Sequence, residues 1–565
     1  MKKLVECVPN FSEGRDKQKI QDIIDHILMI EGVTILDVDS GEDTNRTVVT
    51  IVGEPKPIKE AAFQGIKRAA EILDMSQHIG THPRIGATDV CPFIPISGLS
   101  ENECIELSKN VAERVGSELK IPVFLYEKSA INPDRKKLPD IRKGEYEGLE
   151  KKLNDPNWQP DYGPSKFHLK AGATVIGCRG FLIAYNINLN TKDHRLATDI
   201  AFELREAGRS KRIPNPNSKN LLDGEIVRSK DGKPVKIPGM FKDVKGIGWY
   251  VETFQRAQIS INFNNYKIST IHDVFDSACK LAEDRGVRVT GSELVGLIPL
   301  EAMVMAGKYY LRKQNRSVGV PINDIIECAV QSLGLNDVAP FHPKEKIIDY
   351  AVEKDLDTLI SMTCKDFIDE LSTNSPAPGG GSVSALAGAL GASLSSMVAI
   401  LTHEKKEMLD IKPEMDKIGI EAQLLKDQLT NMVDEDTIAF KNVMSSSRLP
   451  STTEDEKKHK IKSLEAANKY AIEVPMKTAE LCFEVLVLSK NLVEKGNPNS
   501  VTDVGVASEI AFAGLRGACM NVEINLNNIS DSNYRKNFQS KINKIIIKAG
   551  KLRSEIYDQT MSVLH

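Results

Sequence analysis

The hydrophobic pattern of this chain changes near residue 357, and this change most constrains what it can fold into. Before that point, short β-rich runs alternate with helical patterns. Beyond it, strand signals vanish, and apolar residues recur at helical spacing through 382–402, 411–446, 454–491, 501–527 and 535–562. Alternating strands and helices form layered α/β domains, whereas uninterrupted helical patterns form bundles. The sequence therefore predicts a multidomain protein with an α/β front and an all-α helical bundle behind it.

The front part divides into two α/β blocks. Residues 33–39 and 47–52 are expected to form neighbouring strands, followed by a helix over 57–73. A helix over 193–207 and a strand over 258–263 belong to the second block. The expected organisation is two α/β subdomains, a Pro-containing linker and a helical-bundle domain: 1–178, 179–337, 338–356 and 357–565.

Composition excludes several classes of function. The formal net charge is -4, from 74 Lys+Arg against 78 Asp+Glu, so the basic excess of a nucleic-acid-binding protein is missing. Nine widely spaced cysteines fit a reducing cytoplasm, and none forms a CxxC or Cys/His cluster of metal-ligand spacing. We see no signal peptide, and the apolar stretches are about half the roughly twenty residues that a membrane span needs. We therefore expect a cytoplasmic protein without membrane, nucleic-acid or metal binding.

His82 and two aspartates are the candidate catalytic residues of the front part. His82 precedes a proline, which favours an extended loop, and small, rigid residues surround it. Asp37 and Asp39 end a predicted strand, and alternation places both carboxylates on one face. A nearby Asp could orient the His and stabilise its cationic form. Two alternatives stay open: a His that satisfies a local backbone group, and ordinary turn residues at a strand end.

In the back part, a glycine run and one aspartate carry the chemical signal. The sequence SPAPGGGSV at 375–383 places three glycines directly before a helix, where backbone N–H groups suit an anion or where close helix packing is needed. In the helix at 423–443, Asp436 lies within the apolar stripe and Asp434 lies off it. Burial should raise the pKa of Asp436, as an acid/base group requires, unless Lys or a backbone group pairs with it.

Several motifs together resemble one family. The front motifs are similar to glutamate formimidoyltransferase: LVECVPNFSEG at 4–14, DVD at 37–39, NRTV at 45–48, HPRIGATDVCPFIP at 82–95 and FLIAYNINL at 181–189. SPAPGGGSV at 375–383 and VDEDTIAF at 433–440 are similar to formimidoyltetrahydrofolate cyclodeaminase. Their order resembles the bifunctional formimidoyltransferase-cyclodeaminase family over nearly the whole chain.

The resemblance implies two reactions of histidine degradation. The formimino group of N-formimino-L-glutamate moves to N5 of tetrahydrofolate and glutamate is released. The product then cyclises to 5,10-methenyltetrahydrofolate and ammonia leaves. Three alternatives stay open: N-formylglutamate as the donor, activity in only one half, and a folate-binding protein without activity.

The resemblance also assigns residues. It implies His82 and Asp436 as catalytic groups, with Asp39 as a partner that orients or charges His82, and leaves open which of Asp434 and Asp436 holds the proton. No metal is implied. The implied folate-binding residues are Gly163, Pro164, Ser165, Lys166, Phe167, His168, Leu169, Lys170, Ala171, Gly172, Gly239, Met240, Phe241, Gly379, Gly380, Gly381 and Ser382. Lys166, His168 and Lys170 depart from the vertebrate form of the family, so the backbone of that loop is the safer assignment.

Two further expectations concern partners. Family members assemble as homo-oligomers, and contacts through both the deaminase and the transferase parts are implied here. The basic segment 208–245 holds ten Lys/Arg and is longer than in the vertebrate form. It is either a solvated hairpin or a set of cations that attracts the polyglutamate tail of folate.

Overall fold

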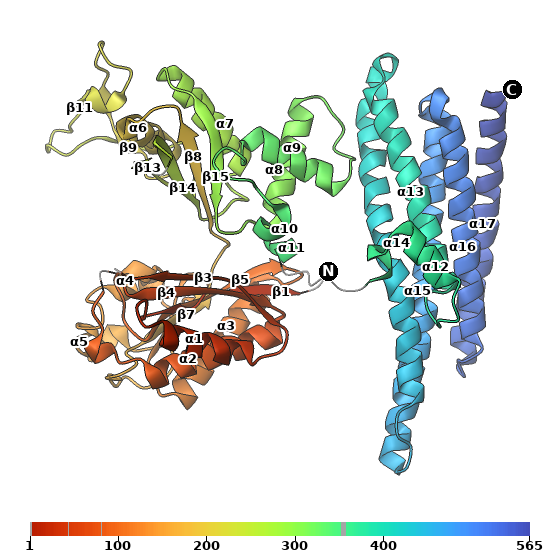
Figure 1. Cartoon of the computed structure of the whole chain (residues 1–565), viewed down its shortest axis with the longest axis horizontal. Helices are drawn as coiled ribbons and strands as arrows, with labels where there is room; N and C mark the ends of the chain where they lie inside the picture. The colour runs from red at the N-terminus through yellow and green to blue at the C-terminus, as the bar shows by residue number, and fades with distance from the viewer. Residues whose placement is uncertain (1–2, 43, 81, 253, 352–357) are drawn as a thin grey trace. The chain divides into compact units, whose positions relative to one another are not determined.

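The computed structural model describes residues 3–42, 44–80, 82–252, 254–351 and 358–565 (Figure 1). The chain forms two compact units. Met1–Met303 and Leu333–Lys354 make up the first, and Val304–Ser332 and Asp355–His565 make up the second. The first unit holds all four sheets of the described residues and the second is helical, so the predicted change from α/β to all-α character is confirmed in outline.

A seven-stranded sheet forms the first part of the chain. Its strands are β1 (Leu4–Cys7), β2 (Asn10–Phe11), β3 (Val33–Gly41), β4 (Arg46–Gly53), β5 (Thr88–Ser97), β6 (Val123–Leu125) and β7 (Thr174–Cys178). The order is β1-β4-β2-β5-β7-β6, and β3 pairs with β4. The pairs β5–β7 and β6–β7 are parallel and the other pairs are antiparallel.

Helices cover both faces of this sheet. Helices α1 (Lys17–Leu28), α2 (Pro55–Ile72) and α3 (Glu101–Glu118) bury their apolar residues against Val5, Cys7 and Phe11. On the opposite face, α4 (Leu138–Arg142) and α5 (Leu149–Leu153) pack their buried leucine and isoleucine side chains with those of β5, β6 and β7. The short helix α4 thus ends with Arg142 close to the loop that precedes β5.

A four-stranded antiparallel sheet follows, in the order β13-β14-β8-β15. Its strands are β8 (Ile183–Leu189), β13 (Val244–Val251), β14 (Arg256–Phe263) and β15 (Val289–Val295), and its helices are α6 (His194–Leu204) and α7 (Ile271–Asp284). Helix α6 comes close to β13 because Gly248 has no side chain: a Cβ there would lie 2.0 Å from the backbone N of Thr198.

The basic segment between α6 and β13 forms two small ladders. Strand β9 (Arg209–Ser210) pairs with β12 (Lys236–Ile237), and β10 (Arg212–Ile213) pairs with β11 (Glu225–Ile226). At its base, the buried Arg209 guanidinium lies 2.7 Å from Asp199 Oδ1. Part of the basic character therefore serves the fold.

Two short helices occupy the segment 338–356, which was expected to be a linker. They are α10 (Pro343–Lys346) and α11 (Ile348–Ala351), and residues 352–356 lie outside the described part. Ile347 forms a parallel bridge with Ile298. Pro343 begins α10, a position that suits proline because its missing N–H would have no helical partner there.

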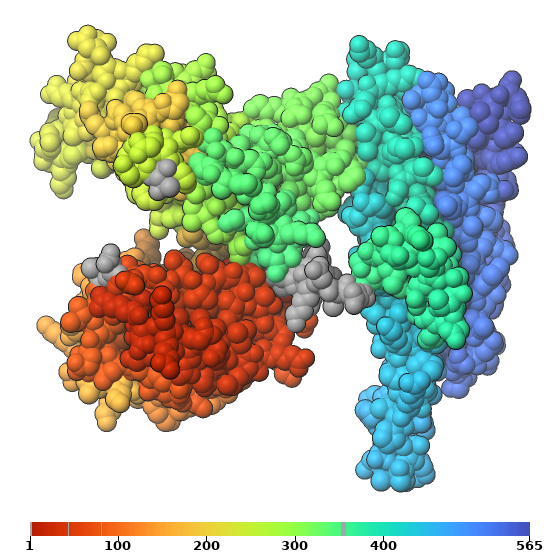
Figure 2. Space-filling model, in the orientation of Figure 1, coloured from red at the N-terminus to blue at the C-terminus, as the bar shows by residue number. Residues whose placement is uncertain are grey.

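Long helices build the second unit, and the predicted helical segments are all confirmed. They are α12 (Cys364–Leu371), α13 (Gly380–Glu404), α14 (Lys412–Ser447), α15 (Glu454–Lys495), α16 (Val501–Leu526) and α17 (Ser532–Leu564). The segment with α12 lies against the bundle surface (Figure 2), where Phe367 packs on Ala385 and Val433.

Residues that precede the predicted linker also join this second unit. Helices α8 (Leu300–Lys313) and α9 (Ile322–Leu333) flank a turn that packs on α13 and α14. Ser317 Oγ and the Val318 N–H donate to Asp416 Oδ1 at 2.9 and 2.8 Å, and Ser396 Oγ donates to the Gly319 carbonyl at 3.1 Å. The division between packed units therefore does not follow chain order.

Helix α13 is the one described helix that is long and apolar enough to span a membrane by length and composition. It lies in the bundle, with 56% of its most apolar window buried, and it buries the polar side chains of Ser395, Thr402 and His403. These are properties of a core helix, and by themselves length and composition are weak evidence of a membrane span.

Candidate functional site

Asp436 lies where α14 passes the beginning of α13. Ser382 Oγ donates to the Val433 carbonyl at 2.9 Å and to Asp436 Oδ2 at 3.3 Å. The backbone N–H of Ser382 also donates to the Asp436 carboxylate. A Cβ on Gly381 would lie 2.0 Å from Asp436 Oδ1, so only glycine permits this approach. The glycine run thus places a carboxylate against the positive end of α13.

Burial raises the pKa of Asp436, and its hydrogen bonds from Ser382 partly oppose that shift. Asp434 differs, because its Oδ1 accepts the Leu359 backbone N–H at 2.7 Å at the start of the turn Leu359–Ser361. The two neighbouring carboxylates therefore have separate environments. The predicted apolar stripe holds Asp436 as expected, but Phe440, which we placed in that stripe, is 39% exposed because it lies at its solvent edge.

The three glycines serve different purposes. A Cβ on Gly379 would meet nothing within 4 Å, and one on Gly380 would lie 3.5 Å from the Asn521 amide nitrogen of α16. Gly381 thus permits the close approach to Asp436, and the space beside Gly379 is open. Further along the helix, a Cβ on Gly388 would lie 2.6 Å from Cys482 Sγ, so close helix packing is also present.

His82 is half-buried in the loop before β5. Its Nδ1 lies 2.8 Å from the Pro83 carbonyl, which can only accept, so Nδ1 carries the proton and Nε2 is left as a base. Burial, followed by the charges of Arg46 and Arg142, lowers the pKa of His82, although the Pro83 bond and Asp89 oppose this. The imidazole is therefore neutral at neutral pH.

A hydrogen-bond network around the buried Arg84 holds the segment around His82. Arg84 donates to both oxygens of Glu147, at 2.9 and 2.6 Å, and its Nε donates to His78 Nδ1 at 3.1 Å. His78 Nε2 in turn donates to the Asn45 carbonyl at 2.9 Å. These side chains also line a cavity of about 460 Å³ beside the segment.

Asp37 and Asp39 lie on β3 with their side chains exposed. A bulge between Ile35 and Asp37 precedes them, and Asp39 pairs opposite Val48. The charge of Asp39 acts on Arg46, which in turn lies close enough to His82 to lower its pKa. A direct contact of Asp39 with His82 stays a prediction.

The predicted folate loop 163–172 is joined to the His82 segment. Gly172 bridges Gly86, and the Ala87 N–H donates to the Ala171 carbonyl at 2.9 Å. Within the loop, Ala171 N–H donates to His168 Nδ1 at 3.0 Å, and the Phe167 ring lies 5.3 Å from that of Tyr146. His168 and Phe167 therefore have structural partners, which favours backbone groups for ligand contacts.

Residues 239–241 lie after the basic segment, where their N–H groups bond to the end of α6. Met240 N–H donates to the Glu203 carbonyl at 2.8 Å, and the Met240 side chain is 58% exposed. Within the described residues, no group of three or more His, Cys, Asp or Glu side chains could hold a metal.

Sequence reasoning missed several polar residues near these sites: Glu6, Arg46, Asp89, Arg142 and Asn521. Burial raises the pKa of Glu6 to about 7 against the opposing charge of Arg179. Three of them lie inside the recognised motifs, namely Glu6, Arg46 and Asp89, but the motifs assign them no role. Their environment depends on pairing between distant segments, which the sequence does not reveal.

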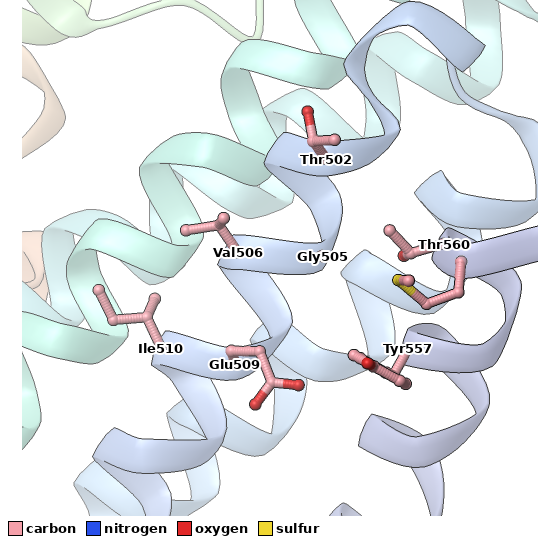
Figure 3. Close-up of a pocket in the computed structure, with 8 residues that line it drawn as sticks. Thr502, Gly505, Val506, Glu509, Ile510, Tyr557 and Thr560 are labelled. Carbon is pink, nitrogen blue, oxygen red and sulfur yellow. The ribbon is translucent and has the colours of Figure 1, made fainter. Parts of the chain in front are cut away.

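An apolar groove of about 580 Å³ runs between α16 and α17 (Figure 3). Val506, Ile510 and Tyr557 are among its lining residues, and none of the predicted site residues is. The groove therefore shares no lining residue with the predicted site around Asp436.

Comparison with known proteins covers both units. The N-terminal subdomain model of the formiminotransferase domain matches residues 4–179, the formiminotransferase domain model matches 184–353, and the formiminotransferase-cyclodeaminase model matches 363–544. A formimidoyltransferase-cyclodeaminase of Mus musculus is 39% identical over 552 residues, 97% of each chain.

Two relatives resemble the parts separately. A glutamate formimidoyltransferase of Streptococcus pyogenes serotype M1 is 41% identical over 315 residues, which cover 56% of this chain and 95% of the relative. A methenyltetrahydrofolate cyclohydrolase of Methylorubrum extorquens is 35% identical over 200 residues, which cover 35% of this chain and 96% of the relative.

Proposed function

This chain belongs to the formimidoyltransferase-cyclodeaminase family, and from that premise we propose that His82 serves the transfer and Asp436 the cyclodeamination. The enzyme transfers the formimino group of N-formimino-L-glutamate to tetrahydrofolate and releases glutamate. It then cyclises 5-formiminotetrahydrofolate to 5,10-methenyltetrahydrofolate and releases ammonia.

In the transfer, N5 of tetrahydrofolate attacks the amidine carbon of the donor. N5 must lose a proton, and the nitrogen of glutamate must gain one before it leaves. Neutral His82 takes the first proton on Nε2 and delivers it to the leaving nitrogen. The lowered pKa of His82 supports this role, because the base is available at neutral pH. Asp39 acts on this base through Arg46.

In the cyclodeamination, N10 attacks the formimino carbon and ammonia leaves. Asp436 takes the proton of N10 and gives a proton to the departing nitrogen. The raised pKa of this carboxyl supports both directions of transfer, because burial makes its protonated form more accessible than that of an ordinary aspartate. The backbone of Gly379–Ser382 lines the folate beside it.

The observation that carries the proposal is that each compact unit holds one candidate acid/base side chain with a shifted pKa, His82 in the first and Asp436 in the second. The test follows glutamate, ammonia and 5,10-methenyltetrahydrofolate together, with tetrahydrofolate omitted in a control for spontaneous donor hydrolysis. His82→Ala should lose glutamate release yet keep ammonia release from supplied 5-formiminotetrahydrofolate. Asp436→Asn should do the reverse. If either variant kept the activity assigned to it, that assignment would fail.

Donor choice and location are part of the proposal. N-formimino-L-glutamate is preferred over N-formylglutamate, and parallel assays with the two donors test this. The protein acts in the cytoplasm as a homo-oligomer, with contacts in both the deaminase and the transferase parts, and sedimentation measures its size. Its subdomains are 1–178 and 179–337, joined through 338–356 to a cyclodeaminase domain at 357–565.

Polyglutamylated tetrahydrofolate is the proposed co-substrate, and cations of the 208–245 segment attract its tail. Arg228 donates to the Gly232 carbonyl at 2.9 Å, so its guanidinium shapes the hairpin, while Lys230 and Lys233 lie exposed at its tip. Replacing both lysines by alanine should weaken a polyglutamylated folate more than the monoglutamate. Equal effects on both would contradict this.

The cyclohydrolase relative favours a second activity of the Asp436 site. Water in place of an amine would add to the methenyl carbon, with Asp436 accepting a proton of the water. One of the two bonds from that carbon to N5 and N10 then breaks, the released nitrogen gains a proton, the hydroxyl loses its proton, and a formyltetrahydrofolate results. Supplied 5,10-methenyltetrahydrofolate should then disappear faster with enzyme than without, and Asp436→Asn should abolish the difference. No acceleration would confine the site to deamination.

A further inference from the structure

We propose that Arg46 and Arg142 form a binding site for the α-carboxylate of the formimino donor, next to His82. The proposal rests on the transferase function above and names the part of the substrate that these two residues bind. Arg46 begins β4, Arg142 ends α4, and both lie close enough to His82 for their charges to lower its pKa. Ninety-six positions separate them in the chain, so the fold brings their charges together.

Arg46 is half-buried and lacks an ion pair within the described residues. Its Nε is buried without a hydrogen-bond partner. Burial lowers its pKa first, the charge of Arg142 adds to that shift, and Asp89 and Asp39 oppose it. Burial and the neighbouring cation therefore both disfavour the charged form of Arg46, and a bound anion would stabilise that charged form.

Arg142 shares one carboxylate with this cation. It donates to Asp89 Oδ2, while Asp89 Oδ1 accepts the Ile85 backbone N–H at 2.9 Å. Its own Nε is buried without a partner. Asp89 is buried and bound to Arg142, whereas Asp39, the other carboxylate whose charge acts on Arg46, is exposed on β3. The buried part of this site therefore holds two cations for one carboxylate, which favours a further anion.

Other buried arginines of this unit do not leave such an excess. Arg84 pairs with Glu145 and Glu147, and Arg135 lies 2.9 Å from Asp161. Each of these arginines has a carboxylate partner of its own, so its charge is already balanced within the fold. Arg46 differs from them in having none, and it lies close enough to His82 to act on its pKa.

The chemistry of the reaction identifies which carboxylate fits. In the donor, the reacting nitrogen is bonded to Cα, and the α-carboxylate is bonded to the same carbon. An anion site beside the proton-transferring histidine therefore coincides with that carboxylate. The glutamate of folate is separated from N5 by the pteridine and the benzoyl group. Arg is suited to the task because its planar fork binds a carboxylate through two parallel hydrogen bonds.

The first test is Arg46→Gln with two donors, N-formimino-L-glutamate and N-formimino-4-aminobutyrate, which lacks only the α-carboxylate. Wild-type enzyme should prefer the natural donor in kcat/KM by about thirtyfold, the value of a charged hydrogen-bond pair. Arg46→Gln should lose most of that preference by raising KM for the natural donor alone. Equal loss for both donors would overturn the proposal.

Two controls separate this site from folding and from folate. Ammonia release from supplied 5-formiminotetrahydrofolate should stay unchanged in Arg46→Gln, because it depends on Asp436. Arg68→Gln, which removes a helix-surface cation paired with Asp22, should leave the donor preference intact. A rise in KM for tetrahydrofolate without one for the donor would assign the cations to the folate carboxylates and overturn the proposal.

A binding measurement keeps the inference independent of turnover. Wild-type protein should bind L-glutamate in calorimetry, and Arg46→Gln should not; Arg46→Lys should bind weakly, since it keeps the charge without the fork. Arg142→Lys should show the same partial loss. If wild type binds L-glutamate but transfers no formimino group, the proposed function fails and the anion site stands. If it binds no L-glutamate, the anion site fails.

Discussion

Gly381 offers the sharpest test of the Asp436 site, because one methyl group there meets the carboxylate directly. In Gly381→Ala, the new Cβ would lie 2.0 Å from Asp436 Oδ1, 2.4 Å from Cγ and 2.5 Å from Oδ2. Real Cβ contacts begin near 3.0 Å. Either the first turn of α13 or the Asp436 side chain must therefore move by about 1 Å or more.

The size of the effect follows from that displacement. A shift of about 1 Å in a positioned catalytic group costs about a hundredfold in rate, so we expect cyclodeaminase kcat/KM to fall about a hundredfold. Alanine improves helix propensity by about 1 kcal/mol, and overpacking costs about 1–3 kcal/mol. The bundle should therefore lose no more than about 2 kcal/mol of stability and remain folded.

The assay measures ammonia release from 5-formiminotetrahydrofolate, with glutamate release from the donor as an internal control in the same protein. Gly550→Ala in α17 is a matched control, because a Cβ there meets nothing within 4 Å. Gly380→Ala should have a smaller effect than Gly381→Ala, because its Cβ makes an ordinary 3.5 Å contact. A folded Gly381→Ala protein with cyclodeaminase activity within threefold of wild type would refute the role of Asp436.

Three further outcomes are expected. Since the pKa of His82 lies below its ordinary value of 6.5, wild-type transferase kcat/KM should fall only as the pH drops below 6.5. Arg46→Gln removes a charge that lowers this pKa, so its acid limb should move to higher pH, and an unmoved limb would argue against His82 as the base. Asp434→Ala should cost about 1 kcal/mol in circular-dichroism unfolding yet keep ammonia release, and loss of that activity would contradict the separation of the two carboxylates. Arg285→Met leaves the fully buried Asp199 with fewer partners and should destabilise the first unit by about 3 kcal/mol, which tryptophan fluorescence can follow because both tryptophans lie there; a change below 1 kcal/mol would contradict it.

Local periodicity was enough to predict the long helices and the position of Asp436. A stripe of apolar residues at helical spacing fixes which side chains face the core, so a carboxylate within it stands out. The same reasoning placed Phe440 in the core, because periodicity does not say where the stripe meets solvent. It did not predict the short helices α10 and α11 within the segment expected to be a linker, because proline marks helix starts as well as breaks.

The electrostatic environment of His82 could not be predicted from the sequence. Arg46 belongs to β4, Asp89 to β5 and Arg142 to α4. Only sheet pairing and the packing of α4 over the sheet bring their charges together, and neither leaves a local pattern. The motif around His82 pointed to it as the candidate base, but the cations that lower its pKa could be recognised only from the fold.

The turn between α8 and α9 has a consequence for how the two activities can be separated. A Cβ on Gly319 would lie 2.5 Å from the Gly419 backbone carbon, so the backbones of these two segments touch without side chains between them. A protein cut at residue 338 would take the turn away from the bundle and leave Asp416 without its two donors. A deaminase fragment that begins at residue 357 would therefore expose the surface around Gly419 and Asp416 that this turn covers. We expect such a fragment to need residues 304–332 supplied in trans for full solubility. The segment that completes the folded deaminase unit thus lies in the chain before the predicted linker.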